Sequence, residues 1–202
     1  MKKIIFLIFV FLIPFKIGYG KTLIAYFTWA DNTIVKSSKN IDVDSIASAS
    51  IISPGNTAQI AQYIQDINGG DIFSIVAADF YPDNFEECLE RVTRERNSNA
   101  RPELKEYLKN INEYDVIFLG YPNWGYTSPM AVFTFLERYD FTGKTIIPFS
   151  VHGTGRLAES ISDIKKVAPA ANYLKPLSIT RSDMKDYKKY VKKWLDEIEI
   201  NK

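Results

Sequence analysis

Short apolar segments alternate with amphipathic helical patterns along most of this 202-residue chain. An almost uninterrupted apolar run of about four to eight residues is typical of a strand in a parallel sheet that is covered on both faces. Five segments have this character, namely residues 23–27, 72–76, 116–119, 145–149 and, more weakly, 172–179. Pro176 indicates that the last of them is an edge strand, because proline cannot donate a hydrogen bond to a sheet.

Helical patterns lie between and after these segments, with apolar residues at the i, i+3, i+4 and i+7 positions. They cover residues 60–67, 85–92, 104–111, a stretch opened by Ser128 and Pro129, 157–168 and 184–198. Asn84 and Glu87 form a capping pair before the second pattern. The alternation predicts one doubly wound α/β domain, in which helices cover both faces of a five-stranded parallel sheet and so make three layers.

Residues 1–20 have the layout of a secretory signal peptide. Lys2 and Lys3 precede an apolar run over residues 4–15, and Gly18 and Gly20 are the small residues of a cleavage site. The run is shorter than the roughly 20 residues that a membrane-spanning helix needs, which favours cleavage over an uncleaved anchor. We therefore expect a domain of residues 21–202, exported to the periplasm, cell envelope or medium, with no stable membrane span after the leader is removed.

Composition excludes several classes of function. The formal net charge of +1 gives no support for nucleic-acid binding, which would show as a strongly basic stripe. Without Lys2, Lys3 and Lys16 of the leader, 22 basic residues remain against 24 acidic ones, and the net charge becomes −2. A single Cys and a single His exclude an internal disulfide framework and a multi-histidine or Cys-rich metal site.

Candidate binding residues follow the first strand, because ligands of open parallel sheets bind beyond the carboxyl ends of the strands. Thr28 and Trp29 come first, and residues 30–53 form a long inserted loop rich in Ser, Asn and Asp. Pro54, Gly55, Asn56 and Thr57 then lead directly into the first helix. Small and hydroxyl residues at a helix N-terminus indicate an anion site, and a simple helix cap by Asn56 or Thr57 is the alternative.

Two more loops carry candidates at the same edge of the sheet. The loop after the third strand contains Pro122, Asn123, Trp124, Gly125 and Tyr126, whose aromatic rings suit either stacking on a planar ligand or a hydrophobic lid. The loop after the fourth strand contains Ser150, His152, Gly153, Thr154 and Gly155, where backbone amides can approach a ligand. His152 is the only His, so a hydrogen-bonding role in the loop is favoured over a general base.

These three loops together resemble the ligand loops of the flavodoxin family, and the resemblance covers residues 21–202. The family's phosphate motif is roughly Thr/Ser-x-Thr-Gly-Asn-Thr. Here it is split, with Thr28 as the opening hydroxyl and Gly55-Asn56-Thr57 as the closing part. Asn32-Thr33 is a competing match, but Asp31 replaces the glycine and no helical pattern follows.

The resemblance implies a strand order of 2-1-3-4-5 and FMN as the cofactor. It implies that Thr28 and residues 54–57 hold the phosphate and that residues 122–126 flank the isoalloxazine ring, with Trp124 or Tyr126 stacking. Residues 150–155 would contact the other edge of the ring. The flavin itself supplies the redox chemistry, so no catalytic side chain is expected.

We expect an oxidoreductase that passes electrons from a reduced donor to a quinone or another small acceptor. A one-electron carrier between redox proteins and a flavin-free binding protein on the same scaffold are the alternatives. Cys88 lies on an apolar helical face and is expected to be packed rather than redox-active. Residues 120–129 and 150–156 contain no Asp or Glu, and the second of these loops ends in Arg156. Acidic carrier flavodoxins have carboxylates near the flavin that destabilise its anionic reduced form. The absence of such carboxylates here favours the anionic reduced flavin.

Overall fold

The computed structural model describes residues 20–36 and 51–198 of the chain. Most of the expected leader and residues 37–50 of the expected insertion therefore lie outside the described residues. The described residues form a single sheet in which every strand pair is parallel. Its strands are β1 (Lys21–Tyr26), β2 (Asp71–Ser74), β3 (Tyr114–Pro122), β4 (Thr145–His152), β5 (Asn172–Tyr173) and β6 (Leu177–Thr180).

The strand order is β2-β1-β3-β4-β5, which confirms the predicted 2-1-3-4-5 topology. The fifth predicted strand differs from the expectation, because residues 172–179 form two short strands instead of one. β5 and β6 both pair with β4, and the break between them contains Pro176, which has no N–H group to donate.

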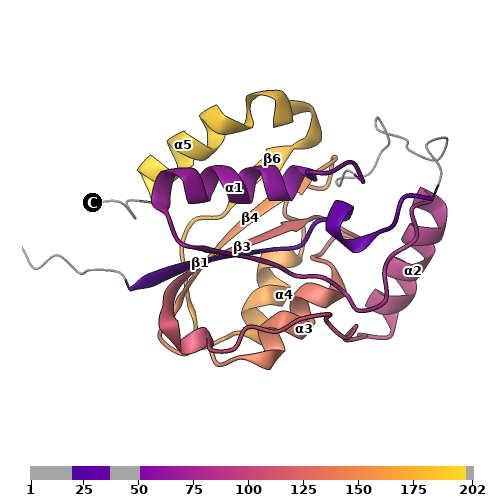
Figure 1. The fold of residues 1–202 in the computed structure, drawn as a ribbon, viewed down its shortest axis with the longest axis horizontal. Helices are drawn as coiled ribbons and strands as arrows, with labels where there is room; N and C mark the ends of the chain where they lie inside the picture. The colour runs from indigo at the N-terminus through magenta and orange to yellow at the C-terminus, as the bar shows by residue number, and fades with distance from the viewer. Residues whose placement is uncertain (1–19, 37–50, 199–202) are drawn as a thin grey trace, which may run out of the picture.

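Helices cover both faces of the sheet, as the alternation predicts (Figure 1). The helices α1 (Asn56–Asn68) and α5 (Tyr187–Glu197) lie on one face, and α2 (Phe85–Asn97), α3 (Met130–Arg138) and α4 (Ser160–Val167) lie on the other. Two separate hydrophobic cores result, one on each face of the sheet. Neighbouring residues of one strand enter different cores, which explains why the strands are apolar almost throughout.

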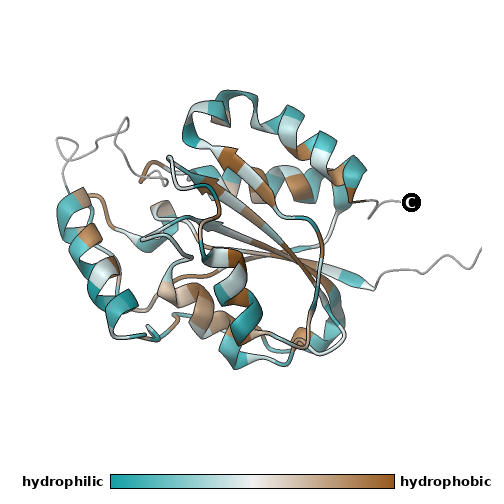
Figure 2. Cartoon of the chain, turned by 180° about the vertical axis from the view of Figure 1, so that it is seen from behind, coloured by the Kyte–Doolittle hydropathy of each residue, from teal (hydrophilic) through white to brown (hydrophobic). Residues whose placement is uncertain are grey.

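Figure 2 shows the consequence for polarity, since the strands are mostly hydrophobic and the outer helix surfaces mostly hydrophilic. In β1, for example, Leu23 and Ala25 face the core under α2, α3 and α4, whereas Ile24 faces the core under α1 and α5. Among the described residues, none of the helices is both long and apolar enough to cross a membrane.

The helix predicted over residues 104–111 is wrong. Leu104 instead forms an antiparallel bridge with Ala77, and the backbone pairs with the segment after β2. Ala78 N–H donates to the Glu103 carbonyl and Lys105 N–H to the Val76 carbonyl, each at 2.8 Å. Leu104 is buried in this extended arrangement, and only a 3₁₀ turn, η3 (Ile111–Glu113), ends the segment.

Local signals at the helix ends agree with the structure more closely. The Asn84 side chain accepts hydrogen bonds from the backbone N–H groups of Glu86 and Glu87, so it caps α2 as expected. Gly69 ends α1 with a φ of +69°. Pro129 immediately precedes α3 instead of occupying its first turn, so the helix begins one residue later than Ser128-Pro129 suggested.

Candidate functional site

The candidate site lies where β1, β3 and β4 end at one edge of the sheet. Tyr26 at the end of β1 pairs with Gly120 in β3, and Tyr121 in β3 pairs with Ser150 in β4. The loops that leave these strands therefore emerge next to one another. The strand order also reverses between β1 and β3, which is where open α/β sheets bind ligands.

The two halves of the split phosphate motif are in direct contact. An ideal Cβ added to Gly55 would lie 1.9 Å from Thr28 Oγ1 and 3.2 Å from Ala30 Cβ. Thr28 itself is buried. Only glycine fits this position, because any side chain would collide with the Thr28 hydroxyl. The fold thus brings Thr28 and Gly55 together although 26 residues separate them in the sequence.

The N-terminus of α1 begins at this contact. Gly55 is the N-cap and makes no side-chain capping bond, and the first turn of α1 contains no acidic residue. Asn56 and Thr57 therefore do not act as the N-cap residue that the alternative interpretation required. The backbone N–H groups of the first turn and the positive end of the helix dipole favour an anion at this point.

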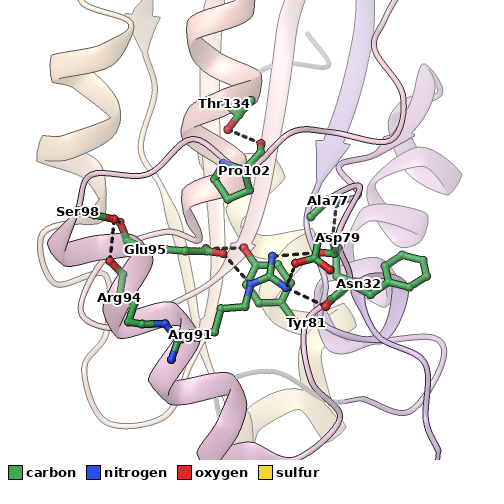
Figure 3. Close-up of polar contacts among 11 residues, drawn as sticks. Asn32, Ala77, Asp79, Tyr81, Arg91, Arg94, Glu95, Ser98, Pro102 and Thr134 are labelled. Carbon is green, nitrogen blue, oxygen red and sulfur yellow. Dashed lines mark hydrogen bonds and ion pairs between the residues drawn. The ribbon is translucent and has the colours of Figure 1, made fainter.

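The competing motif match at Asn32 has a structural role. Asn32 is fully buried, and its Nδ2 donates to the carbonyls of Thr28 and Ile75 at 2.9 and 3.0 Å. Its Oδ1 accepts from Ala77 N–H at 2.7 Å (Figure 3). These three bonds join the loops after β1 and β2 and use both N–H donors of the amide and one lone pair of its oxygen. Asn32 therefore holds the loops after β1 and β2 together and, being buried, is not available to a ligand.

The loop after β3 contains a tight hairpin. Trp124 N–H donates to the Thr127 carbonyl at 2.8 Å, and Thr127 N–H donates back to Trp124 at 3.2 Å. Gly125 and Tyr126 lie between them with φ values of +59° and +69°, the combination of a two-residue hairpin turn. A tyrosine with positive φ is strained by about 1 kcal/mol or more. Its side chain is 65% exposed, so the turn presents this ring to solvent.

Trp124 is not accessible for stacking on a ligand. It is only 8% exposed and packs edge-on against Phe27, Trp29 and Tyr81, with ring centroids 5.2 to 5.9 Å apart. The Trp29 indole donates to the Pro82 carbonyl and is equally buried. Of the two candidates for stacking, Tyr126 has the accessible ring, whereas Trp124 and Trp29 form the packed layer beneath the loops.

A polar network that the sequence analysis missed supports this aromatic layer (Figure 3). The Arg91 guanidinium lies 4.0 Å from the Tyr81 ring centroid and pairs with Glu95 at 2.8 Å. Tyr81 donates its hydroxyl to the same carboxylate at 2.8 Å. Burial, together with the Glu95 charge, raises the pKa of Tyr81 above its ordinary value. The i, i+4 spacing of Arg91 and Glu95 was the signal available in the sequence.

The loop after β4 packs against the hairpin. Gly155 lies beside it, since an added Cβ would be 3.4 Å from Asn123 Nδ2 and 3.9 Å from Tyr126 Cδ1. Asn123 Nδ2 donates to the Arg156 carbonyl at 2.5 Å, and Glu159 N–H donates to the Tyr126 carbonyl at 3.0 Å. The residues expected to flank opposite edges of a ligand therefore form one continuous rim.

Two candidates of this third loop are interior residues. Ser150 and His152 belong to β4, and both are buried. The His152 ring nitrogens lie 3.0 Å from the Gly153 carbonyl and 2.8 Å from Ser178 Oγ. His152 is therefore a hydrogen-bonding residue, as the sequence favoured, but it lies at the end of β4 and not in the loop. The described ranges also contain no group of three His, Cys, Asp or Glu residues that could hold a metal ion.

The candidate residues divide into two groups by exposure. At least partly exposed are Pro54, Asn56, Asn123, Gly125, Tyr126, Gly153, Thr154 and Gly155. Buried are Thr28, Trp29, Gly55, Thr57, Pro122, Trp124, Ser150 and His152.

This fold, with its loops gathered at the reversal of strand order, defines a doubly wound α/β protein with a candidate ligand site at the carboxyl edge of the sheet. The family model described as Flavodoxin matches residues 45–198, and the chain belongs to the flavodoxin family. Flavodoxins are a standard example of ligand binding at such a reversal. Among proteins with curated descriptions, none matches this chain.

Solved structures give the same fold. A proposed flavoprotein from Bacteroides eggerthii is 27% identical, with a TM-score of 0.67 over 90% of this chain and 99% of its own. One from Bacteroides uniformis is also 27% identical, with a TM-score of 0.64 over 86% and 99%. A Lactobacillus acidophilus flavoprotein, solved in complex with FMN, is 17% identical, with a TM-score of 0.54 over 84% and 97%.

Proposed function

We propose that this protein binds FMN and acts as an oxidoreductase. The observation that carries the proposal is the contact between Thr28 and Gly55 at the open N-terminus of α1. It joins a buried hydroxyl, a glycine without room for a side chain and an uncapped helix, which together suit a phosphate group. The flavodoxin family and the FMN complex of the Lactobacillus acidophilus protein support the same cofactor.

The residues fit the two parts of FMN separately. Thr28 and residues 54–57 would hold the phosphate through a hydroxyl, backbone N–H groups and the helix dipole. Tyr126 would cover the isoalloxazine ring, since it is the exposed aromatic residue of the hairpin. Asn123 and the backbone of residues 153–155 would form the remaining edge. Bound FMN would supply the redox chemistry, and the protein would supply position and electrostatics.

The phosphate site can be tested by replacing Asn56 with Asp. A carboxylate in the first turn of α1 favours the helix by about 0.3–1 kcal/mol but repels a bound phosphate. We expect Asn56→Asp to keep or raise the thermal stability while weakening FMN binding at least tenfold, as measured by quenching of flavin fluorescence. Riboflavin, which lacks the phosphate, should bind the variant and the unchanged protein equally.

Gln62→Glu is the matched control, since it places the same charge on the exposed side of α1 away from its N-terminus. It should leave FMN affinity unchanged. Absence of quenching of micromolar FMN by residues 21–202 would contradict the proposal, as would equal affinity of the unchanged protein for FMN and riboflavin.

The acceptor is proposed to be a quinone or another small molecule, supplied with electrons by a reduced nicotinamide or similar donor. The net charge of −2 expected for residues 21–202 is much less negative than that of a strongly acidic electron carrier. This favours a small acceptor over a protein partner. Steady reduction of a soluble quinone by the FMN-loaded protein would support this activity. Fast electron exchange with redox proteins and no turnover with quinones would show a carrier instead.

We also propose that the protein is exported, on the basis of the leader-like residues 1–20. The mass of the protein recovered from the envelope or medium of a bacterial host should correspond to residues 21–202. Recovery of the full 202-residue mass from the cytoplasm alone would contradict this.

A further inference from the structure

Arg156 is held in an unusual backbone conformation at the rim of the candidate site. Its φ is +52°, which is strained for a residue with a side chain. Its carbonyl is fixed by Asn123 Nδ2 at 2.5 Å, and the preceding Gly155 lies against Tyr126. The loop thus fixes the backbone of this arginine next to the exposed aromatic residue.

The Arg156 guanidinium has no partner within residues 20–36 and 51–198, and its side chain is exposed. Neighbouring cations are neutralised instead. Arg96 pairs with Glu159 at 3.5 Å, and Lys166 pairs with Asp163 at 2.8 Å. The acidic groups nearest to this loop in the sequence are therefore already engaged, and the charge of Arg156 stays uncompensated.

Arg156 is also the only charged residue of the two loops that form the rim. Residues 120–129 and 150–158 contain no Asp, Glu or Lys and no second Arg. An arginine keeps its proton at any physiological pH, so this rim has a permanent positive charge.

We propose that Arg156 selects the anionic, reduced form of bound flavin over the oxidised form, an inference that rests on the proposed FMN site. Oxidised FMN takes up two electrons from a donor and one proton from solvent and thereby gains one negative charge on its ring system. A cation at the rim attracts this charge and leaves the neutral oxidised ring almost unaffected. The protein would then bind reduced FMN more tightly than it does without the arginine.

The test compares the unchanged protein, Arg156→Gln and Arg156→Lys in the FMN-loaded form. Dithionite supplies the electrons, and the two-electron midpoint potential is measured together with the dissociation constant of oxidised FMN. We expect Arg156→Gln to lower the ratio of affinities for reduced over oxidised FMN by about three- to tenfold. Tenfold corresponds to a midpoint about 30 mV more negative for a two-electron couple. Arg156→Lys should retain most of the ratio.

Two controls separate charge from other effects. Lys189→Gln removes a positive charge from an exposed site on α5 and should leave the ratio unchanged. Arg156→Gly removes the charge together with the backbone strain, so it should shift the ratio like Arg156→Gln while raising stability. An unchanged ratio in Arg156→Gln, or an equal loss in Arg156→Lys, would overturn the inference. Failure of the unchanged protein to bind FMN would instead overturn the proposed function.

Discussion

Tyr126 combines a strained backbone conformation with an exposed aromatic ring. It is a bulky aromatic residue with positive φ, placed where glycine or asparagine would fit without strain. Its ring is exposed, so burial does not compensate for this cost. Such strain concentrates at binding sites, where the surrounding structure holds it in place.

Replacing Tyr126 with Gly should therefore separate the two properties. We expect Tyr126→Gly to raise the free energy of unfolding by about 1 kcal/mol, because the turn is relieved. FMN affinity should fall severalfold, since the ring no longer stacks. Urea denaturation and flavin fluorescence measure the two effects. As a control, Tyr190→Ala removes an exposed tyrosine from α5 and should not change FMN affinity. A Tyr126→Gly protein less stable than the unchanged protein would show that the backbone of Tyr126 is not strained.

Cys88 is predicted to be chemically inert in the folded protein. Its side chain is 4% exposed, and burial raises the pKa of the thiol to about 12. At pH 8 the reactive thiolate is therefore rare as well as shielded. Iodoacetamide should modify Cys88 slowly in buffer and rapidly in 6 M urea, as followed by mass spectrometry. Equal rates in the two solutions would show that the α2 face is open.

At the level of elements, the loops after β1, β2 and β3 are joined by packing rather than by sequence proximity. Asn32 bonds the first two loops together, and Trp124 packs the third onto both through Phe27 and Tyr81. This layer gives the exposed residues of the rim a rigid base.

Asn32→Asp tests this layer through its pH dependence. The aspartate keeps the acceptor for Ala77 N–H but turns a charged oxygen toward the carbonyls of Thr28 and Ile75, where the amide donated. Burial and these carbonyls raise the pKa of the new carboxyl, so the variant loses stability as pH rises through that pKa. We expect a loss of about 2–4 kcal/mol at pH 7 that becomes smaller toward pH 4. Asn32→Ala should show a loss that does not depend on pH.

Most of the element layout was predictable because it rests on strong local patterns. The strands of two-sided apolar character, the cap at Asn84 and the start of α1 after Gly55 all follow from residue type and spacing. The helix predicted over residues 104–111 was wrong because the spacing of Leu104 and Ile111 also suits an extended segment that is buried at intervals. Only the backbone pairing with Val76 and Ala78 distinguishes the two, and pairing between distant segments leaves no local signal.

The loops of the candidate site could be predicted from the sequence, but which of their aromatic side chains is exposed could not. Trp124 and Tyr126 are both aromatic residues beside Gly125, and composition cannot say which faces the core. The turn geometry decides it, since Trp124 packs against Phe27 and Trp29 of the segment after β1 and against Tyr81 of the segment after β2. The network of Arg91 and Tyr81 is likewise a product of tertiary contact.

For the whole molecule, ligand binding and folding are coupled through the parts that form the site. The loops of the rim come from strands at the centre of the sheet, which share both hydrophobic cores. A ligand that joins these loops therefore stabilises the complete domain, since it binds only the folded chain.

FMN should accordingly raise the melting temperature of residues 21–202. At a concentration one hundred times the dissociation constant, the gain is about 2.7 kcal/mol, which corresponds to about 5–11 °C for a domain of this size. Differential scanning fluorimetry with FMN and riboflavin at equal concentrations measures this. The smaller rise expected for riboflavin reports the phosphate contribution, and a melting temperature independent of FMN would contradict binding.

The direct contact between Thr28 and Gly55 has a consequence for protein engineering. It closes the chain on either side of the insertion, so the intervening length is not what holds the two residues together. Each doubling of a flexible loop costs only about 0.6 kcal/mol of closure entropy. We therefore expect that a peptide epitope or a small reporter domain can be introduced between Lys36 and Ile51, beside the candidate site, where it leaves the contacts of Asn32 and the buried Ile51 in place.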